Sequence, residues 1–352
     1  MSNNVKAFGT EAKDKPLKQM TIERREVTAK DIEIDILYCG VCHSDLHTAR
    51  NDWGGTMYPS VPGHEIVGKV TKVGKEVTKF KVGDIAAVGC MVDSCQTCES
   101  CKKDLEQYCQ NGFTGTYNGK DKHLGGRTFG GYSEKVVVDE NFVLKVPENL
   151  DLAAAAPLLC AGVTTWSPLS HWNVKEGSKV AVVGLGGHGH MAIKLAKGLG
   201  AEVTLFSRSE SKEKDAKELG ADQVVISTNA SHMKAVNGKF DLIIDTVPYD
   251  HDLNPYISTL ATNGTLVLVG YLGNLENLIN TVPMILGRKS VAGSLIGGIA
   301  ETQEMLDFCG KHNIVSELEM IDMQNINDAY ERMLKSDVRY RFVIDMKSLK
   351  NN

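Results

Sequence analysis

Residues 179–200 read KVAVVGLGGHGHMAIKLAKGLG, and this stretch decides the fold of the chain around it. It begins with a short, β-branched apolar run at 179–183, which is typical of a buried parallel strand. The next six residues, 184–189, fit the pattern G-x-G-x-x-G. Apolar residues recur at helical spacing over 192–196, and Gly200 is expected to end the helix. The order of strand, glycine-rich turn and helix predicts a dinucleotide-binding site.

Each glycine of this turn has a physical task. Gly184 allows the tight turn, Gly186 lets a pyrophosphate approach the backbone, and Gly189 lets helix and strand pack closely. The N–H groups at the helix N-terminus favour the phosphates of the cofactor. A chance match is the alternative, because the chain has 34 glycines, but the flanking strand and helix disfavour it. The predicted cofactor contacts of the turn are Gly184, Leu185, Gly186, Gly187 and Gly189, whereas His188 receives no role.

The composition is that of an ordinary soluble protein of about two domains. The 352 residues are 42% hydrophobic and 24% charged, and the formal net charge is −5. This negative balance argues against nucleic acid or an anionic membrane as the main partner. The chain has no apolar run of roughly 18 residues, and its start lacks the apolar core of a signal peptide. We therefore expect a cytoplasmic protein, whose nine cysteines are better explained as metal ligands or buried thiols than as disulfides.

The pattern of strand and helix candidates changes near residue 150. Residues 1–149 are β-rich, with short strands expected at 32–37, 65–73, 85–88 and 133–138. From 150 to 295 strands and helices alternate, with strands expected at 202–206, 223–226, 241–245, 265–269 and 290–295. Helices are expected between them at 210–219 and 253–259, and the tail holds a helix at 325–334 and a strand at 341–346. The alternation predicts an α/β fold with a doubly wound parallel sheet.

Four cysteines lie close together in a loop of the β-rich region. Their spacing is C-x2-C-x2-C-x7-C, and they are Cys95, Cys98, Cys101 and Cys109. Closely spaced thiolates suit a closed, tetrahedral Zn²⁺ site with no open position, which indicates a structural role. One alternative is four reduced thiols without a metal. Another is an iron–sulfur cluster, which the long x7 gap and the absence of Pro after Cys109 disfavour.

Three further candidate ligands lie far apart in the sequence. Cys42 lies in GVCHSDLH (40–47), His64 in PGHE (62–65) and Cys160 in LLCAG (158–162). Taken singly, each has an ordinary structural explanation, since such a cysteine is usually a small buried residue and a lone His beside Gly is usually in a turn. Spacing alone does not unite the three positions. Two Cys and one His with a water would, however, form an open catalytic zinc site.

In combination, these segments resemble a known family. GVCHSDLH, YPSVPGHEIVGKV, the four-cysteine lobe, CAGVTTWSPL and GLGGHGHMAIKLAK occur in this order and resemble the zinc-dependent medium-chain alcohol dehydrogenases. The nearest branch is the cinnamyl alcohol dehydrogenase type, which includes broad-specificity NADPH-dependent aldehyde reductases. The resemblance extends from about residue 5 to 347. It implies a Rossmann cofactor-binding domain at 150–295 and a GroES-like catalytic domain at 1–149, completed by 296–352, with the zinc lobe at about 90–112.

The resemblance implies two zinc ions per chain. Cys42, His64 and Cys160 correspond to the catalytic zinc ligands, and Cys95, Cys98, Cys101 and Cys109 correspond to the ligands of the structural zinc. Glu65 matches the acidic neighbour of the catalytic zinc, and Asp45 matches the carboxylate that orients the ligating His.

The resemblance also implies a path for the proton. Ser44 matches the hydroxyl of the proton relay and His47 matches its solvent-side end. His43 falls where the family has a group near the cofactor pyrophosphate. For Ser44 and His47 the ordinary alternative is a turn hydroxyl and a surface imidazole.

The end of the second strand of the α/β region predicts the cofactor. NAD-selective folds carry an acidic residue there, which binds the ribose 2′-hydroxyl. This chain instead has Ser207, Arg208 and Ser209, followed by Lys212, and these groups suit a 2′-phosphate. The carboxylate of Glu210 nearby slightly disfavours a phosphate site. The alternative explanation is that Arg208 and Lys212 are solvated charges at the start of a helix. We expect NADP(H), with Thr246 and Val247 completing the cofactor contacts.

The sequence says less about the substrate. Trp53 and Met57 are candidates to line a pocket, although apolar packing explains them equally well. Thr114 stands where lignin-pathway relatives tend to carry an aromatic residue, which favours general aldehyde reduction over a dedicated cinnamyl pocket.

We therefore expect an NADPH-dependent aldehyde reductase that forms a homodimer through the edge strand at 290–296. The alternatives are an NAD-dependent polyol or amino-alcohol dehydrogenase of the same fold, and a non-catalytic NADPH-binding redox sensor.

Overall fold

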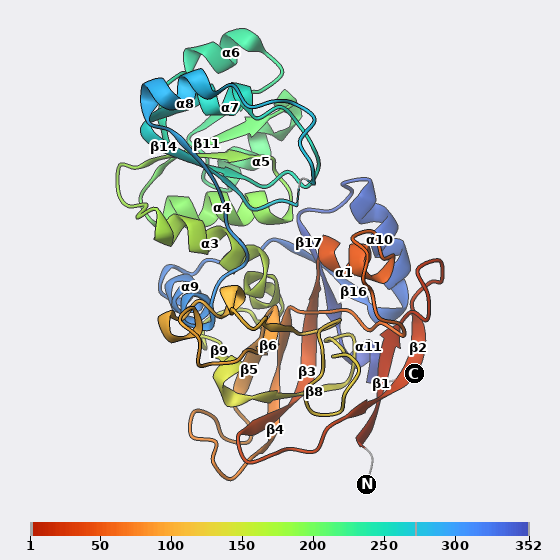
Figure 1. The fold of residues 1–352 in the computed structure, drawn as a ribbon. Coiled ribbons are helices and arrows are strands. Elements are labelled where there is room, and N and C mark those ends of the chain that lie inside the picture. The colour runs from red at the N-terminus through yellow and green to blue at the C-terminus, as the bar shows by residue number, and fades with distance from the viewer. Residues whose placement is uncertain (1–2, 272, 351–352) are drawn as a thin grey trace. The chain divides into compact units, whose positions relative to one another are not determined.

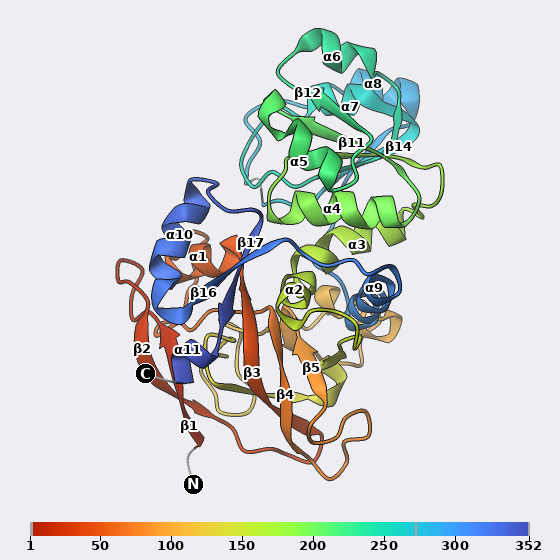
Figure 2. The same cartoon turned by 180° about the vertical axis from the view of Figure 1, so that it is seen from behind.

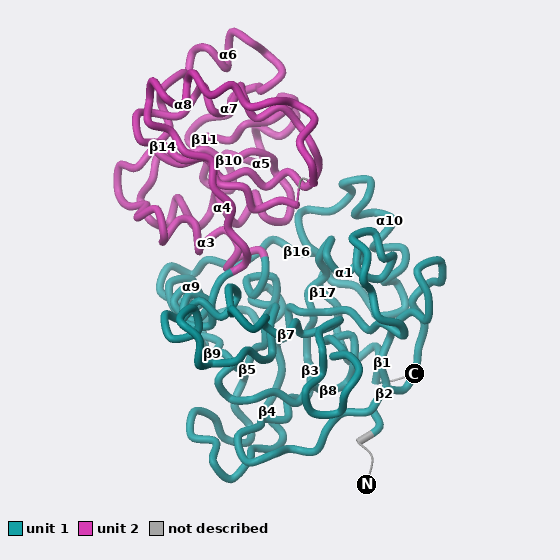
Figure 3. Tube along the Cα trace, in the orientation of Figure 1, with its two compact units in different colours: residues 1–160, 297–352 teal, residues 161–296 magenta. Residues whose placement is uncertain are grey.

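The computed structural model describes residues 3–271 and 273–350, which form two compact units (Figure 3). Unit 1 comprises residues 1–160 and 297–352, and unit 2 comprises residues 161–296. The predicted boundary at 149/150 lies ahead of this division, because two short helices that follow it pack against strands of unit 1. These are α2 (Leu152–Ala155) and η4 (Ala156–Leu159).

Unit 2 contains the predicted doubly wound parallel sheet. In the described residues the sheet has the order β12-β11-β10-β13-β14-β15, and all its pairs are parallel. Its strands are β10 (Lys179–Val183), β11 (Glu202–Ser207), β12 (Gln223–Ile226), β13 (Phe240–Asp245), β14 (Leu260–Leu268) and β15 (Ser290–Gly293). The strand order reverses between β10 and β13. In such sheets the ligand binds at the carboxyl ends of the strands, beside this reversal.

Helices cover both faces of this sheet. They are α3 (Ala161–His171), α4 (Gly187–Gly198), α5 (Glu213–Glu218), α6 (Ala230–Ala235), α7 (Asn254–Thr259) and α8 (Thr281–Gly287). Within unit 2, α3 and α4 lie together on one side of the strands, and α7 and α8 lie on the other (Figures 1 and 2). The helix expected at 210–219 is shorter, because its first turn, Glu210–Lys212, is a 3₁₀ helix. Gly200 follows the end of α4 with a φ of +85°, which is the left-handed conformation expected of a helix-ending glycine.

Unit 1 is built on a mainly antiparallel sheet. Its order is β16-β17-β3-β4-β5-β9, and β8 also pairs with β3. The strands of the sheet are β3 (Asp31–Val41), β4 (Ile66–Val73), β5 (Ile85–Val88), β8 (Lys135–Asp139), β9 (Leu144–Lys145), β16 (Leu318–Asp322) and β17 (Arg341–Asp345). Two smaller strand pairs join β1 (Asn3–Gly9) with β2 (Lys18–Arg24), and β6 (Met91–Asp93) with β7 (Thr114–Gly115).

The C-terminal segment is part of unit 1. Strand β17 pairs with β3, so residues from the two ends of the chain share one sheet, which is visible as blue beside red in Figure 1. The helices of this unit also include α1 (His43–Ala49), α9 (Ile299–His312), α10 (Ile326–Leu334) and α11 (Lys347–Lys350). No single helix in the described part of the chain is long and apolar enough to cross a membrane. The consecutive helices at 152–159 and 161–171 meet that test of length and composition only when taken together.

Candidate active site

Strand β3 delivers Cys42 to the start of a helix. Cys42 is the N-cap of α1, and its backbone N–H donates to Asp45 Oδ2 at 2.8 Å. An acceptor in the first turn satisfies one of the N–H groups that a helix start leaves unpaired. The same turn brings the Ser44 hydroxyl within 3.1 Å of Cys42 Sγ. The local fold of GVCHSDLH therefore places a thiol, a hydroxyl and a carboxylate within one helical turn.

Asp45 also fixes His64. The Asp45 carboxylate is fully buried, and its Oδ1 lies 3.0 Å from His64 Nδ1 and accepts the Gly63 backbone N–H at 3.0 Å. Because Nδ1 is engaged in this way, the other ring nitrogen, Nε2, is the one available to a metal. The orienting role that the resemblance implied for Asp45 agrees with these contacts.

Cys160 joins these residues from a distant part of the sequence. It follows η4, which packs on β3, and its Sγ lies 3.9 Å from Cys42 Sγ. Ligand atoms of Cys42, His64, Glu65 and Cys160 lie within 4.8 Å of one another, and all four residues are buried. Tetrahedral zinc–sulfur bonds of about 2.3 Å put two sulfurs about 3.8 Å apart. The donor set and its spacing therefore fit zinc.

The two thiols influence each other's pKa. A hydrogen bond from Cys160 lowers the pKa of Cys42 well below its usual value, although burial opposes this shift. The same hydrogen bond raises the pKa of Cys160. One sulfur of the pair is thus prepared to act as a thiolate, which is the form that binds a metal.

Glu65 is a buried carboxylate with one unpaired oxygen. Its Oε1 forms an ion pair with Arg341 of β17, whereas its Oε2 is buried and has no hydrogen-bond partner. Burial raises the pKa of Glu65 to about 7, against the opposing charge of Arg341. A side chain on Gly40 would collide with Glu65 Oε2, so the backbone of β3 approaches the carboxylate closely. The unpaired oxygen belongs to the donor group of the site and fits a position beside a cation.

Three residues of this region were not found by the sequence analysis. The Tyr132 hydroxyl donates to Asp45 Oδ2 at 3.3 Å, and the Tyr117 ring lies 5.5 Å from the His64 ring. Arg341, the partner of Glu65, is 3% exposed. A basic residue at the start of an apolar strand was the available signal for Arg341. The two tyrosines gave none, since nothing local in the sequence relates them to positions 45 and 64.

The predicted relay residues lie on and beside α1. His47 Nδ1 lies 2.8 Å from Asp52 Oδ2, and the His47 side chain is 25% exposed. The ring of Trp53, a predicted pocket residue, is 5.1 Å from the His47 ring. His43 is exposed at the first position of α1, 6.2 Å from His47 between ring centres.

The other two predicted pocket residues are less closely connected to the ligand group. Met57 is half-buried, and its backbone N–H donates to Asn118 at 2.8 Å. Thr114 is buried in β7 and lines a small cavity with Arg24 and Asp121, which none of the four ligand residues lines. The position of Thr114 therefore gives its pocket assignment no support.

The four-cysteine lobe forms a second group of donors. Cys95, Cys98, Cys101 and Cys109 also have their sulfur atoms within 4.8 Å of one another. The measured S···S separations are 3.9 Å for Cys95–Cys101, 3.5 Å for Cys98–Cys101 and 4.0 Å for Cys98–Cys109. Backbone N–H groups also point at the sulfurs, such as that of Gln110, which is 3.4 Å from Cys98 Sγ. Four thiols at this spacing fit a closed zinc site.

The glycine-rich turn of unit 2 has the predicted conformation. Gly184 has a φ of +88°, and a side chain on Gly189 would collide with the Gly184 carbonyl oxygen. Gly186 is the exposed N-cap of α4, and a Cβ on it would meet no atom within 4 Å. Thr246 and Val247 lie opposite the turn, since a Cβ on Gly184 would be 3.2 and 3.3 Å from their side chains. The space above Gly186 and the helix N-terminus together suit a pyrophosphate.

The residues predicted to select the cofactor follow β11. The Ser207 hydroxyl donates to the Ser209 carbonyl at 2.8 Å, and the Ser209 and Ser211 hydroxyls are 2.7 Å apart. Arg208 is exposed, and Lys212 ends the 3₁₀ turn Glu210–Lys212. No carboxylate lies at the end of β11, so the structure has a cationic residue and hydroxyl groups at the position where the sequence predicts them.

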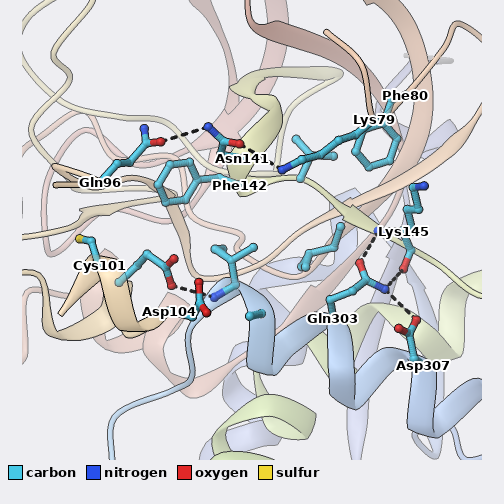
Figure 4. A pocket seen from close by; sticks show the side chains of 15 residues that line it. Lys79, Phe80, Gln96, Cys101, Asp104, Asn141, Phe142, Lys145, Gln303 and Asp307 are labelled. Carbon is cyan, nitrogen blue, oxygen red and sulfur yellow. Dashed lines mark hydrogen bonds between the residues drawn. The ribbon is translucent and has the colours of Figure 1, made fainter. Parts of the chain in front are cut away.

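A cavity of about 610 Å³ lies elsewhere in unit 1, beside the four-cysteine lobe (Figure 4). Its polar side chains bind one another: Asn141 contacts Lys79 and Gln96, each at 3.0 Å. Gln303 of α9 contacts Asp307 and the backbone of Lys145. Cys42, His64 and Cys160 are not among the residues that line this cavity (Figure 4), so it is not the reaction site.

Comparisons with known proteins agree with this geometry. The family model of the alcohol dehydrogenase GroES-like domain matches residues 28–148, and that of the zinc-binding dehydrogenases matches residues 187–311. Aldehyde reductase YahK of Escherichia coli is 52% identical over 346 residues, covering 98% of this chain and 99% of YahK. NADP-dependent alcohol dehydrogenase C 1 of Mycolicibacterium smegmatis is 51% identical over 350 residues, covering 99% of this chain and 100% of the relative.

A solved structure extends the comparison to the fold. The cinnamyl alcohol dehydrogenase of Helicobacter pylori, complexed with NADP(H), aligns with a TM-score of 0.92 and 44% identity, covering 99% of both chains. The fold and the resemblance predicted from the motifs are confirmed. The chain belongs to the zinc-binding alcohol dehydrogenase family.

Proposed function

We propose that this protein reduces aldehydes to alcohols with NADPH, at a zinc ion held by Cys42, His64 and Cys160. The observation that carries the proposal is the convergence of these three donors and Glu65 within 4.8 Å. Two thiols and one imidazole leave a fourth position open for a substrate oxygen. The names of the two relatives, an aldehyde reductase and an NADP-dependent alcohol dehydrogenase, support the same reaction.

The chain's own residues handle the proton. When bound, zinc would polarise the aldehyde oxygen and NADPH would supply the hydride. Ser44 Oγ lies beside Cys42 Sγ, where it can pass a proton to the product oxygen. His47 is the outer end of this path, because its imidazole is partly exposed to water and can both accept and donate a proton. Asp52 orients the ring of His47 through Nδ1.

The cofactor proposal depends on the end of β11. Arg208 can bind a phosphate through two parallel charge-assisted hydrogen bonds. Ser207, Ser209 and Lys212 add hydroxyl and ammonium donors near it. The absence of a carboxylate at this strand end disfavours NAD, whose ribose hydroxyl needs an acceptor.

We assign the second zinc to the four-cysteine lobe, where it is structural. All four ligands are thiols, so no position remains for a substrate. For the substrate we propose a broad range of aldehydes, in line with the aldehyde-reductase branch that the motifs resemble.

We also propose a homodimer formed by the edge of the unit 2 sheet. β15 is the last strand of the sheet order, and its residues are half-buried or exposed. Helix α8 beside it exposes Val282, Ile285 and Leu286, by 57%, 76% and 84%. The spacing of these three residues places them on one face of the helix. An exposed apolar face next to an open sheet edge suits pairing with a second copy.

The cytoplasm is the compartment that we propose. Six of the cysteines belong to the two donor groups, and such thiol sites are typical of a reducing compartment. Cell fractionation with an antibody against the chain tests this assignment.

The test of the reaction combines kinetics with metal analysis. Purified protein is assayed with a panel of aldehydes and alcohols and with both cofactors, by the absorbance of reduced nicotinamide. We expect turnover with NADPH and two zinc ions per chain. Cys160→Ser should abolish turnover and retain the fold, whereas Cys309→Ala, a buried cysteine outside both donor groups, should leave turnover unchanged. A fully active Cys160→Ser protein contradicts the proposal.

A further inference from the structure

The turn that follows β13 packs directly against the glycine-rich turn. The Thr246 hydroxyl donates to the Val183 carbonyl at 2.8 Å, at the end of β10. The Val247 backbone N–H donates to Asp245 Oδ1 at 3.0 Å. These contacts hold the start of the 245–251 turn at the carboxyl end of the sheet, where a dinucleotide is expected.

Arg208 and Tyr249 meet across this end of the sheet. Arg208 follows β11, Tyr249 lies in the turn after β13, and β10 separates the two strands. The centre of the Arg208 guanidinium lies 5.9 Å from the centre of the Tyr249 ring. This separation is within the range of a cation–π contact, which extends to about 6 Å. The half-exposed Tyr249 side chain therefore contacts Arg208, the residue that we assign to recognition of the 2′-phosphate.

His251 in turn fixes the backbone of Tyr249. Its Nδ1 lies 2.9 Å from the Tyr249 carbonyl oxygen, and its Nε2 lies 2.9 Å from Asp245 Oδ2. A carbonyl and a carboxylate both accept, so the two ring nitrogens donate together only in the imidazolium form. The hydrogen bond to Asp245 raises the pKa of His251, which favours that form, while partial burial opposes it. Tyr256 packs edge-on against the ring at 5.8 Å.

We infer that Tyr249 and His251 are positioning residues for recognition of the cofactor 2′-phosphate by Arg208, an inference that rests on the proposed use of NADP(H). An exposed arginine samples many rotamers, and ordering it on binding costs free energy. The Tyr249 ring restricts the guanidinium before the cofactor arrives. His251 holds the turn that presents the ring, because it ties the Tyr249 carbonyl to the buried carboxylate at the end of β13.

The test uses ligands that need neither zinc nor an aldehyde. Binding of adenosine 2′,5′-bisphosphate and of AMP to the full chain is measured by calorimetry. The proteins are the wild type, Tyr249→Phe, Tyr249→Ala, Arg208→Ala and the double variant Arg208→Ala/Tyr249→Ala. We expect Tyr249→Ala to weaken binding of the bisphosphate about two- to fivefold, the range of an exposed cation–π contact, and to leave AMP binding unchanged. Tyr249→Phe keeps a ring and should bind both ligands like the wild type.

The double variant and a histidine variant complete the experiment. In the Arg208→Ala background, Tyr249→Ala should have no further effect, because the ring acts through Arg208. His251→Gln should weaken bisphosphate binding in the same direction as Tyr249→Ala.

The outcomes separate two failures. If the wild type does not prefer the bisphosphate to AMP, the cofactor assignment fails and the inference fails with it. If the wild type prefers the bisphosphate and Arg208→Ala removes the preference, but Tyr249→Ala retains it, only the inference is overturned. Equal weakening of both ligands by Tyr249→Ala also overturns it, because the ring would then contribute to the adenosine site and not to the phosphate site.

Discussion

At the scale of single residues, we expect the uncharged Tyr132 to support the proposed zinc site. Its side chain is fully buried, and its hydroxyl reaches the same carboxylate that orients His64. Tyr132→Phe keeps the shape and removes this hydrogen bond. Loss of such an outer partner typically weakens metal binding 10–100-fold, and the length of this bond, 3.3 Å, favours the lower limit of about tenfold. Competition with a chelating dye measures the change, and Tyr58→Phe, whose hydroxyl binds Ala49, is the control. Wild-type zinc retention by Tyr132→Phe would contradict the role.

Arg208 is the second residue whose effect can be measured alone. We expect kcat/KM with NADPH to exceed kcat/KM with NADH at least tenfold in the wild type. A tenfold ratio requires a difference in transition-state stabilisation of only about 1.4 kcal/mol between the two cofactors. Arg208→Asp should move this preference toward NADH, because a carboxylate repels the 2′-phosphate and accepts from a ribose hydroxyl. Lys214→Asp makes the same charge change on an exposed side chain of α5 and should leave the ratio unchanged. An unaltered ratio in Arg208→Asp would refute the assignment.

At the scale of elements, the four-cysteine lobe contains little regular structure. The lobe has two single-turn 3₁₀ helices, Cys101–Lys103 and Glu106–Tyr108, between its ligands. The lobe therefore depends on metal binding for much of its folding free energy. In small peptides, the binding free energy of structural zinc is about 10–16 kcal/mol. Cys98→Ser should lower the zinc content from two to one per chain and lower the temperature of unfolding. Metal analysis and thermal unfolding check both, and two retained zinc ions would exclude the predicted ligand role.

The 245–251 turn should respond to pH through His251. Its imidazolium contacts are complete below the ordinary histidine pKa of about 6.5 and are lost as the pH rises through the raised pKa of the folded state. Asp245 and Asp250 are the charged groups that favour the imidazolium. The KM for NADPH should therefore increase as the pH rises above neutral, and the KM of His251→Gln should be higher and nearly independent of pH over that range. Measurements with NADH correct for effects common to both cofactors, and identical profiles in wild type and His251→Gln would disprove the response.

At the scale of the whole molecule, local patterns could be predicted from the residues themselves, whereas contacts between distant residues could be predicted only where the family resemblance implied them. The β10–α4 segment could be read from the sequence because its strand, turn and helix signals are contiguous. Arg341 and Glu65 are separated by 276 positions, and their pairing depends on β17 joining β3. The helix at 210–219 was predicted as one element, whereas its first turn is a 3₁₀ helix, since helix ends are the least determined part of a periodic pattern.

The proposed homodimer would be the largest-scale consequence of the sheet edge. If α8 covers its counterpart in a second copy, a charge at its most exposed apolar position has to be desolvated in the dimer. Leu286, 84% exposed in the single chain, is that position. Leu286→Lys should raise the Kd of the dimer by about 30-fold or more, because loss of one central interface contact costs about 2 kcal/mol of binding free energy. Leu334→Lys makes the same change at a 49% exposed position on unit 1 and should leave the dimer intact. Light scattering at micromolar concentration measures the mass, and a monomeric wild type, or a Leu286→Lys protein that remains fully dimeric, would exclude this interface.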